Sequence, residues 1–596
     1  MTYRAPVSDI LFSLNHVAGF GEALRQGLFG ELDAPTAASV IEEAGRFATD
    51  AIAPLNRAGD LHGSKYENGS VATPPGFRDA YRAWAAGGWA GVTGAPEFGG
   101  MGLPHAVSAA CSELWAGASM GFALCPLLSE AAVNAIARFA APDLRALYLP
   151  KLISGEWTGT MNLTEPQAGS DLNAVKSRAE PAGDGTYRLF GQKIFITYGE
   201  HDMADNIVHL VLARLPGAPS GTRGLSLFLA PKFLPRPDGA PGERNDLRCA
   251  SIEHKLGIHA SPTCVMIYGD SGGATAWLVG EENRGLAAMF TMMNNARLGV
   301  GLQGVAIADR ALQQALAYAR ERRQGRSGKG GDGAMSPIVE HPDVQRMLLT
   351  MRALVHAARG ICHLTAVAID LSRRAKTEKE RREAEERAAL LTPVAKAFST
   401  DIGDEAASLG IQVHGGMGFI EETGAAQHFR DSRIAAIYEG TNGIQAIDLA
   451  LRKLPLAGGE AIRREIADMR AIQSEVAERG GAGFGAAAAR LGEALDAFER
   501  ATRFMSAARP EPNDALAGAT PYLRLFGLVR GGACLAKAGL AAEGLAAAGD
   551  RSELGRVALA RFFAEKILTA APGLAASVES GAGALSDFER AIGGGQ

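Results

Sequence analysis

The spacing of apolar residues changes twice along this chain, and these two changes limit what it can fold into. Up to about residue 151, and again from residue 281, apolar residues recur every three or four positions, as on the buried face of an α-helix. Between these regions they fall in short alternating runs, which are typical of β-strands. The runs cover residues 158–164, 187–197, 207–213, 225–230 and 264–268. We therefore expect a mainly α-helical protein with a central β domain.

The helical regions extend well beyond the β region on both sides. Helical spacing is clearest over residues 37–52, 106–138, 285–322, 341–372, 385–409 and 443–454. A further alanine- and leucine-rich helical pattern follows Pro455 and continues to about residue 570. Because 596 residues is several times the length of a typical domain, more than one core is expected. We expect four domains, over residues 1–157, 158–280, 281–455 and 456–596, of which only the second is built from strands.

Composition argues against several kinds of partner. The net charge is −5, and no stripe of lysine and arginine is interleaved with aromatic residues, so nucleic-acid binding is not expected. Uninterrupted apolar runs stay shorter than the roughly 20 residues of a spanning helix, so no membrane span is expected either. Asp9 and Asn15 interrupt the first apolar stretch, unlike a secretory signal, and we expect a cytoplasmic protein.

The cysteines and histidines are dispersed. The six cysteines form no Cys-x-x-Cys pair, and the 12 histidines form no i,i+4 pair beside a carboxylate. These are the spacings that zinc and redox sites commonly use. We therefore expect no metal site, and cysteines that are buried free thiols.

Two polar stretches are predicted to lie on the surface. Residues 324–337 are rich in glycine, serine and lysine, which indicates a mobile connection between two helices that could act as an exposed lid. Residues 373–387 are a dense run of mixed charge. We interpret this run as a solvated helix face with i,i+4 ion pairs rather than as a binding site.

The candidate chemistry is carried by five dispersed segments. They are Leu-Thr-Glu-Pro-Gln-Ala-Gly-Ser-Asp at 163–171, Phe-Ile-Thr-Tyr-Gly at 195–199, Ala-Tyr-Ala-Arg-Glu-Arg-Arg-Gln-Gly-Arg at 317–326, Gln-Val-His-Gly-Gly-Met-Gly-Phe at 412–419 and Ile-Tyr-Glu-Gly-Thr-Asn-Gly-Ile-Gln at 437–445. Each is weak alone: the glycine cluster could be a helix C-terminus, and Glu439 an exposed residue at a helix start. In this order they resemble the acyl-CoA dehydrogenase family over about residues 40–455.

The resemblance implies a fold, a cofactor and a reaction. The fold is a helical N-terminal domain, a β-barrel-like middle domain and a four-helix bundle, here followed by an additional helical domain. The cofactor is FAD, and the reaction converts an acyl-CoA thioester to the trans-2-enoyl-CoA. Electron-transferring flavoprotein is the electron acceptor that the family normally uses. Because the extra domain could replace a second dimer, we expect a homodimer.

The first two segments resemble the family's flavin-side loop and the strand beside the flavin. By this resemblance, Thr164 and Ser170 contact the flavin. Phe195, where the family usually has tryptophan, provides an apolar wall. The hydroxyl of Thr197 is placed to donate to flavin N5.

The third and fourth segments resemble the parts of the family that meet the FAD of a neighbouring subunit. Arg322 and Gln324 match residues at its pyrophosphate and adenine. Gln412, Gly415 and Gly416 belong to a glycine-rich turn, where a backbone without side chains can bring amide groups close to phosphate.

The fifth segment resembles the family's catalytic turn, and the resemblance makes Glu439 the base. Removing the weakly acidic α-hydrogen of a thioester needs a positioned carboxylate while a hydride leaves the β-carbon. The Glu439 backbone amide would hold the thioester oxygen. Tyr438 would contact the acyl group, and Thr441 the FAD. Arg297 matches an arginine near CoA, with Asn294 three residues before it.

The long C-terminal extension and the opening segment, residues 3–12, resemble larger bacterial members of the family. They most resemble the group that oxidises 3-methylthiopropionyl-CoA, which is also called 3-methylmercaptopropionyl-CoA. That substrate is the best match, with other short or aryl acyl-CoAs as alternatives. Three further alternatives stay open at this point. A flavin oxidase or monooxygenase on the same fold commonly lacks the glutamate; an aldolase or hydratase would need no flavin; and a non-catalytic assembly protein would use the added domain to bind a partner.

Overall fold

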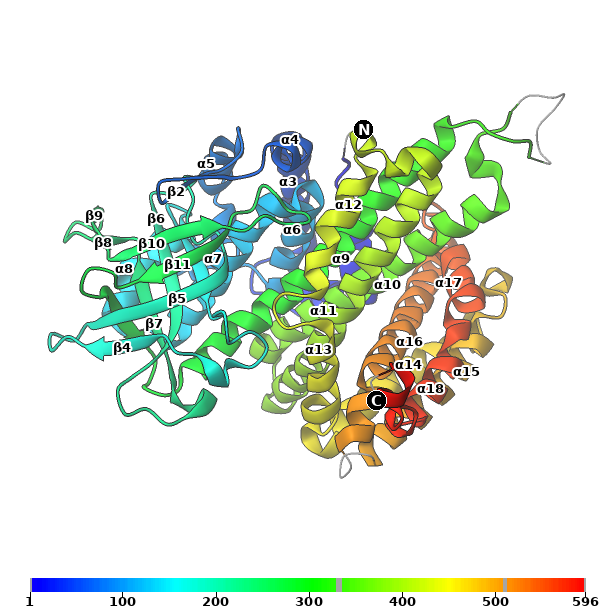
Figure 1. Cartoon of the computed structure of the whole chain (residues 1–596). Helices are drawn as coiled ribbons and strands as arrows, with labels where there is room; N and C mark the ends of the chain where they lie inside the picture. Colours follow the sequence, from blue (N-terminus) through cyan, green and yellow to red (C-terminus); the bar gives the residue numbers. More distant parts are fainter. Residues whose placement is uncertain (1–2, 328–334, 508–511, 594–596) are drawn as a thin grey trace. The chain divides into compact units, whose positions relative to one another are not determined.

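A computed structural model describes residues 3–327, 335–507 and 512–593 and is mainly helical (Figure 1). The chain forms two compact units. Residues 2–5 and 41–299 form the first, which we call the sheet unit, and residues 6–40 and 300–596 form the second, the bundle unit. The four domains expected from the sequence are thus grouped differently, because residues 6–40 lie with the bundle.

The sheet unit is built around an eight-stranded sheet in the order β10-β11-β5-β12-β7-β6-β3, with β4 pairing off this path to β5 and β6. All five predicted runs are strands, and the sequence pattern missed β4, β10 and β12. Pairing is antiparallel except between β3 and β6 and at the single β4–β6 bridge. The strands are β3 Trp157–Asn162, β4 Arg178–Pro181, β5 Tyr187–Thr197, β6 Asn206–Arg214, β7 Leu225–Pro231, β10 Leu247–Ile252, β11 Thr263–Tyr268 and β12 Ala274–Val279.

Both faces of the sheet are covered, which explains why β3, β6 and β7 are almost wholly buried. Successive side chains of a strand point to opposite faces. Val208 and Leu210 of β6 pack with residues of α7 and α8, whereas Val211 packs in a second core with β5 and β11. The helices of this unit include α4 Leu55–His62, α5 Phe77–Ala86, α6 His105–Ala118, α7 Met120–Phe139 and α8 Pro142–Ile153.

The bundle unit contains most of α9 and the long helices that follow it. Its main helices are α9 Gly285–Glu321, α10 Pro342–Arg374, α11 Glu378–His414, α12 Ala425–Ser432, α13 Asn442–Asp448, α14 Glu460–Arg479, α15 Ala487–Ala507, α16 Pro512–Ala547, α17 Gly555–Lys566 and α18 Ala571–Glu579. The helix expected over 385–409 is the middle of α11. In Figure 1, α14–α18 of the additional region lie together as one helical group.

The charged run at 373–387 is not one continuous solvated face. It spans the end of α10 and the start of α11, where Thr377 and Glu380 form a reciprocal capping box. An i,i+4 pair, Lys379–Glu383, is present at 4.0 Å, as expected. At its end, however, Arg387 pairs with Glu465 of α14 at 2.8 Å. Part of the run therefore connects α11 to the additional helical region.

The amino-terminal segment is held by helices near the other end of the chain. The guanidinium of Arg556 in α17 donates to Asp9 at 2.8 Å, and Lys537 Nζ in α16 donates to the carbonyl of Val17 at 3.0 Å. Ser13 Oγ lies 3.0 Å from Nδ1 of His363 in α10. The elements of this segment, α1 Val7–Phe12 and α2 Phe20–Arg25, thus belong to the packing of the bundle unit.

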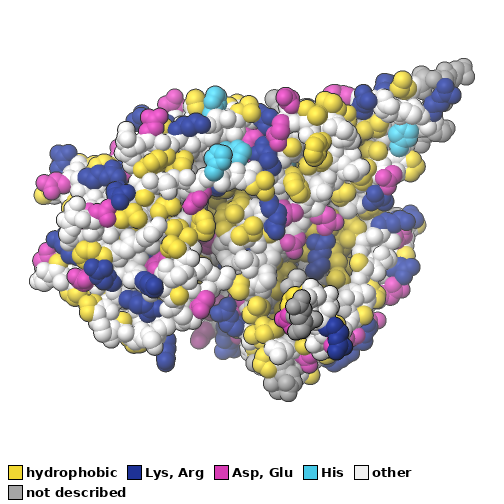
Figure 2. Space-filling model, in the orientation of Figure 1, with side chains coloured by type: hydrophobic (Ala, Val, Ile, Leu, Met, Phe, Trp, Pro, Cys, Tyr) yellow, Lys and Arg dark blue, Asp and Glu magenta, His cyan; other side chains and the backbone are white. Residues whose placement is uncertain are grey.

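Three described helices, α7, α10 and α16, are long and apolar enough to cross a membrane by length and composition. This corrects the expectation from uninterrupted apolar runs, because such a helix tolerates a few charged residues. Within each apolar stretch, 83%, 83% and 78% of the residues are buried in the protein. Among the described residues, basic and acidic side chains are interspersed over the face shown in Figure 2.

A buried ion-pair network joins α16 to α14. The side chains of Arg530 and Glu465 are 1% and 2% exposed and pair at 3.0 Å, and Arg530 also pairs with Asp468. The two carboxylates are shared with Arg387 of α11. The charges of the network compensate one another, so removing one partner leaves another buried charge poorly paired.

Arg530→Met is therefore expected to lower the free energy of unfolding by about 3 kcal/mol, the low end for a broken buried pair, because Arg387 still contacts Glu465. The measurement is denaturant unfolding followed by circular dichroism. Arg490→Met is the control, since its pair with Glu493 is exposed and its loss should cost less than about 1 kcal/mol. Equal losses in the two variants would contradict the role of burial.

Candidate active site

The predicted flavin-side loop leaves the end of β3 and folds into a tight turn. The backbones of Glu165 and Ala168 are joined by two hydrogen bonds of 3.0 Å. The carbonyl of Thr164 accepts from the amide of Ile194 in β5 at 2.9 Å. Thr164 is half-buried and Ser170 is exposed. The loop is thus fixed at its base and open at its tip.

A buried ion pair holds this loop in place. Lys193 of β5 is fully buried, and its Nζ donates to Glu165 Oε1 at 2.8 Å and to the carbonyl of Leu163 at 2.9 Å. Glu165 also accepts from the amides of Lys176 and Ser177. Burial opposes ionisation of this carboxyl, but the charge of Lys193 and these hydrogen bonds prevail and lower the pKa of Glu165 to about 2. Burial lowers the pKa of Lys193 to about 8.

Two residues further along β5, a bulge turns Phe195 outward. Between the Lys193–Met266 and Ile196–Cys264 pairs, β5 has one residue more than β11. Phe195 takes up this difference with a left-handed φ of 60°, and it is 58% exposed. Thr197, half-buried at the end of β5, accepts through its carbonyl from Thr160 at 2.7 Å.

These features of the sheet unit fit a flat, acceptor-rich ring system. The unit offers an exposed aromatic face at Phe195, a hydroxyl on Thr197 and an open loop tip at Ser170. An exposed phenylalanine ring gains by covering its apolar surface. Thr164, Ser170, Phe195 and Thr197 are therefore the residues of this unit that would hold a flavin.

The predicted CoA residues lie on the first part of α9, in the sheet unit. Arg297 is only 5% exposed, and its Nη1 donates to Oδ1 of Asn294 at 3.2 Å. Asn294 is therefore an acceptor for this arginine, whose guanidinium is largely covered.

In the bundle unit, Glu439 lies in the turn between α12 and α13. Its φ is 56° and that of Gly440 is 84°, both in the left-handed region. For a residue with a side chain this conformation costs roughly 1–2 kcal/mol, so surrounding contacts must enforce it. Gln445 of α13 provides two of these contacts, because its Nε2 lies 3.2 Å from the carbonyl of Glu439 and 3.3 Å from that of Gly440.

The residues on either side of Glu439 are also fixed. The hydroxyl of Tyr438 donates to Oε1 of Gln303, a buried residue of α9. Burial, together with the charge of Glu439, raises the pKa of Tyr438 well above its usual value, so the phenol is a neutral donor. Thr441 caps α13 by accepting from the amide of Ile444 at 3.3 Å. Glu439 thus sits between an anchored ring and a capped helix.

Arg322 and Gln324 are exposed and follow the end of α9. Backbone hydrogen bonds from Ile338 to Arg322 and from Gln324 to Ser336 join the two ends of the connection to α10. The predicted mobile stretch 324–337 is therefore paired at its base, and its residues 328–334 lie outside the described residues. Arg322 is exposed and could meet an anionic group.

The glycine-rich turn ends α11. Gln412, Gly415 and Gly416 are exposed, and a side chain added to either glycine would meet nothing within 4 Å. Their openness fits the approach of a phosphate, while the φ of 61° at Gly415 also fits a helix end. Crowding instead requires glycine at Gly418, where a Cβ would lie 2.2 Å from the carbonyl of Ile411.

Three apolar side chains beside this turn are exposed. Met417, Phe419 and Ile420 are 48%, 86% and 44% exposed. Consecutive exposed apolar residues commonly mark a surface that another molecule covers. We refer to these three residues as the turn patch.

Sequence reasoning missed the residues that support the site from beneath. They are Glu165, Lys193, Gln303, Lys396, Asn442 and Gln445. Glu165, Asn442 and Gln445 stand within the motifs, but their side chains point into the protein and bond to it. Lys193 and Lys396 each stand in an apolar segment, and a lysine in such a segment was the available signal.

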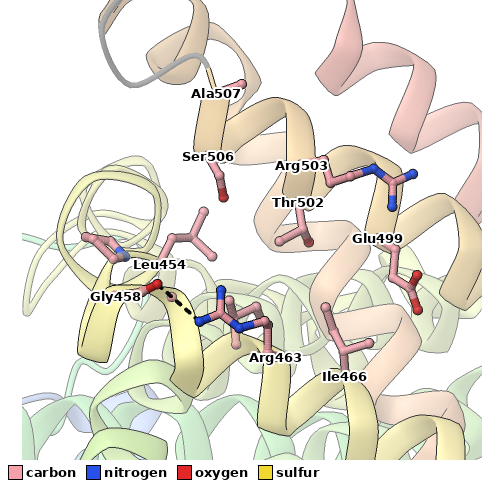
Figure 3. A pocket seen from close by; sticks show the side chains of 12 residues that line it. Leu454, Gly458, Arg463, Ile466, Glu499, Thr502, Arg503, Ser506 and Ala507 are labelled. Atoms are coloured by element: carbon pink, nitrogen blue, oxygen red, sulfur yellow. Dashed lines mark hydrogen bonds between the residues drawn. The ribbon is translucent and has the colours of Figure 1, made fainter.

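The bundle unit also contains a cavity of about 830 Å³ between the residues before α14 and the helices α14 and α15 (Figure 3). Arg463 lies at its edge and donates to the carbonyl of Gly458 at 3.3 Å. Arg463 is also paired with Glu460 at 2.7 Å. None of the predicted site residues lines this cavity, and it is not part of the candidate active site.

Four family models match successive parts of the chain. Three of them describe the N-terminal, middle and C-terminal domains of acyl-CoA dehydrogenase, and they match residues 34–156, 160–271 and 283–454. The fourth, described as "Acetyl-CoA dehydrogenase C-terminal like", matches residues 464–589. The first three contain every residue predicted for the site. The fourth matches the additional helical region.

Individual proteins are similar over most or nearly all of the chain. The 3-methylmercaptopropionyl-CoA dehydrogenase of Ruegeria pomeroyi is 48% identical over 95% of this chain and 96% of its own. A butyryl-CoA dehydrogenase of Syntrophomonas wolfei is 36% identical over 71% of each. The crystal structure of Caenorhabditis elegans ACDH-11 in complex with C11-CoA covers 95% of this chain and 92% of its own, with a TM-score of 0.76 and 20% identity.

The chain therefore belongs to the acyl-CoA dehydrogenase family. Members of this family bind FAD, and the protein is a flavin-dependent oxidoreductase that acts on an acyl-CoA. The sequence-based expectations of family, fold and reaction class are confirmed. Hydratase or aldolase chemistry, and a purely structural role, lose their support.

Lys193→Met should weaken retention of FAD. Breaking a buried pair costs about 3–5 kcal/mol, and a loss of only 1.4 kcal/mol in binding already corresponds to tenfold. We expect the dissociation constant for FAD, measured by fluorescence titration of the apoprotein, to rise at least about tenfold.

Lys176→Met is the matched control, because Lys176 contacts Glu165 through its backbone amide and its side chain is exposed. An unchanged FAD affinity in Lys193→Met would show that the ion pair does not support the loop.

Proposed function

We propose that the protein oxidises a short acyl-CoA to its trans-2-enoyl-CoA, and that 3-methylmercaptopropionyl-CoA is its substrate. The observation that carries the substrate proposal is the similarity to the Ruegeria pomeroyi enzyme over nearly the whole of both chains, including the additional helical region. The butyryl-CoA dehydrogenase covers a smaller share of the chain at lower identity, so butyryl-CoA is the substrate to compare.

Glu439 is the proposed base. Its carboxylate would take the α-proton of the thioester, a task that needs a fixed base because the C–H bond is only weakly acidic. Bound FAD supplies the acceptor for the β-hydride. The left-handed turn and the hydrogen bonds from Gln445 to the carbonyls of Glu439 and Gly440 fix the backbone at this position. The Glu439 amide would donate to the thioester oxygen, where negative charge develops.

The neighbouring residues would position the substrate and the cofactor. Tyr438, fixed by Gln303, would contact the acyl group, and a buried neutral phenol suits an apolar chain. Arg297, oriented by Asn294, would lie near the CoA moiety. Thr441 would contact FAD in addition to capping α13.

The remaining partners follow from the same family. We propose electron-transferring flavoprotein as the electron acceptor and a homodimer as the assembly, in the cytoplasm. The exposed turn patch supports the dimer, since three apolar side chains beside a predicted cofactor contact gain free energy when a second copy covers them. In that dimer, Arg322, Gln324, Gln412, Gly415 and Gly416 would meet the FAD of the partner.

Glu439→Gln should abolish most of the reduction of the flavin. An amide cannot accept the α-proton, and a positioned base contributes about 100- to 10,000-fold to a rate. The measurement is anaerobic bleaching of the flavin absorbance on mixing with 3-methylmercaptopropionyl-CoA and, separately, with butyryl-CoA. The first thioester is expected to bleach the wild type faster.

Glu422→Gln is the control, because Glu422 is an exposed acid on the same segment of the chain. Bleaching of Glu439→Gln at the control rate would exclude Glu439 as the base. Faster reduction by butyryl-CoA would replace the proposed substrate, and bound FAD that neither thioester reduces would point to another acyl group.

The homodimer predicts a particle of twice the mass of one chain in light scattering. Phe419→Glu is expected to shift the population toward single chains, because a carboxylate would be buried at the contact. Phe588→Glu is the control, since Phe588 is also exposed but lies in the additional helical region. A wild-type monomer would rule out the proposed assembly.

A further inference from the structure

A buried lysine, Lys396, hydrogen-bonds to the turn that carries Glu439. Lys396 lies on α11, and its side chain is fully buried. Its Nζ donates to the carbonyl of Gly440 at 2.9 Å and to Oδ1 of Asn442 at 2.9 Å. A buried ammonium needs acceptors for its hydrogens, so these contacts are costly to lose. Lys396 thereby ties α11 to the residue after Glu439 and to the first residue of α13.

Asn442 extends this contact along α11. Its Nδ2 lies 2.6 Å from Oδ1 of Asp401, 3.0 Å from Oγ1 of Thr400 and 3.2 Å from the carbonyl of Ala397. The side chain of Asn442 therefore stands between a buried cation and a carboxylate on the same helix. Its orientation is fixed, because only its oxygen can accept from Lys396 and only its nitrogen can donate to Asp401.

The contacts act on the part of the chain that most needs them. Glu439 and Gly440 are both left-handed, and the conformation of Glu439 is unfavourable in itself. Gln445 reaches the carbonyls of both residues from α13, and Lys396 reaches the carbonyl of Gly440 from α11. Two helices thus hold the same short turn, and Lys396 reaches it from outside the segment 437–445.

We propose that Lys396 is a positioning residue for α-proton removal, which fixes the direction of the Glu439 side chain by holding the Gly440 carbonyl and Asn442. The inference rests on the proposed role of Glu439 as the base. Lys396 does not touch the substrate; its effect is on how well the carboxylate is aligned when the proton is transferred. Misalignment of a reacting group slows the chemical step more than it weakens binding.

The test compares Lys396→Met with wild type as FAD-bound, full-length protein. The rate of anaerobic flavin reduction by 3-methylmercaptopropionyl-CoA is expected to fall at least about tenfold, while the dissociation constant of the thioester changes less than about threefold. The α-deuterium isotope effect on reduction is expected to increase, because proton removal becomes more limiting. If Lys396 only stabilised the fold, its replacement would lower the melting temperature but leave the reduction rate and the isotope effect unchanged.

Thr392→Val is the matched control, since Thr392 lies one turn earlier on α11, is buried and donates only within its own helix, to Ala388. If Lys396→Met does not fold, Lys396→Gln replaces it, because its amide can still donate one hydrogen bond. A reduction rate within threefold of the control in the folded variant would overturn the inference. Wild-type protein that this thioester does not reduce would overturn the proposed substrate, and the variants would then be compared with butyryl-CoA. Wild-type protein whose reduction does not depend on Glu439 would overturn the proposed base and the inference with it.

Discussion

Two buried lysine side chains donate hydrogen bonds to backbone carbonyls and so hold two irregular segments of the candidate active site, the flavin-side loop and the Glu439 turn. Lys193 bonds to the carbonyl of Leu163 at the base of the flavin-side loop, and Lys396 bonds to the carbonyl of Gly440 in the Glu439 turn. Both lysines are fully buried and extend from regular elements, β5 and α11. A loop cannot form the repeating hydrogen bonds of a helix or strand, so its carbonyls need other donors. In this protein a cation inside each unit provides them.

The two lysines differ in how their charge is balanced. Lys193 contacts a carboxylate directly, and the pKa of Glu165 is lowered to about 2 as a result of that charge and several hydrogen bonds, in spite of burial. Lys396 donates to two neutral oxygens, the Gly440 carbonyl and Asn442 Oδ1, and Asn442 in turn contacts Asp401. Burial raises the pKa of Asp401. The flavin-side loop is therefore held by an ion pair, and the Glu439 turn by a chain of hydrogen bonds between a cation and an acid.

Most of the fold could be predicted from the sequence because its periodic elements are long and strongly patterned. The change from helical to alternating spacing located β3, β5, β6, β7 and β11, whereas β4, β10 and β12 were missed. β4 has only four residues, three of them exposed, and a bulge after Cys249 shifts the alternation of β10. Site residues could be proposed from the sequence where its motifs resemble those of the family, as at Glu439 and Thr164. Its supporting residues were not, because Gln303 and Lys396 are far from the motifs in sequence and only tertiary packing brings them to Tyr438 and Gly440.

The attachment of the first residues to the last helices has a consequence for synthesis of the protein. Asp9 and Val17 emerge from the ribosome more than 500 residues before their partners Arg556 and Lys537. The acidic side chain of Asp9 also contacts Arg352 and His356 of α10, which are made earlier. The start of the chain can therefore find part of its environment during translation but not all of it. A chain that stops before α17 lacks Arg556, and its Asp9 therefore loses this hydrogen bond.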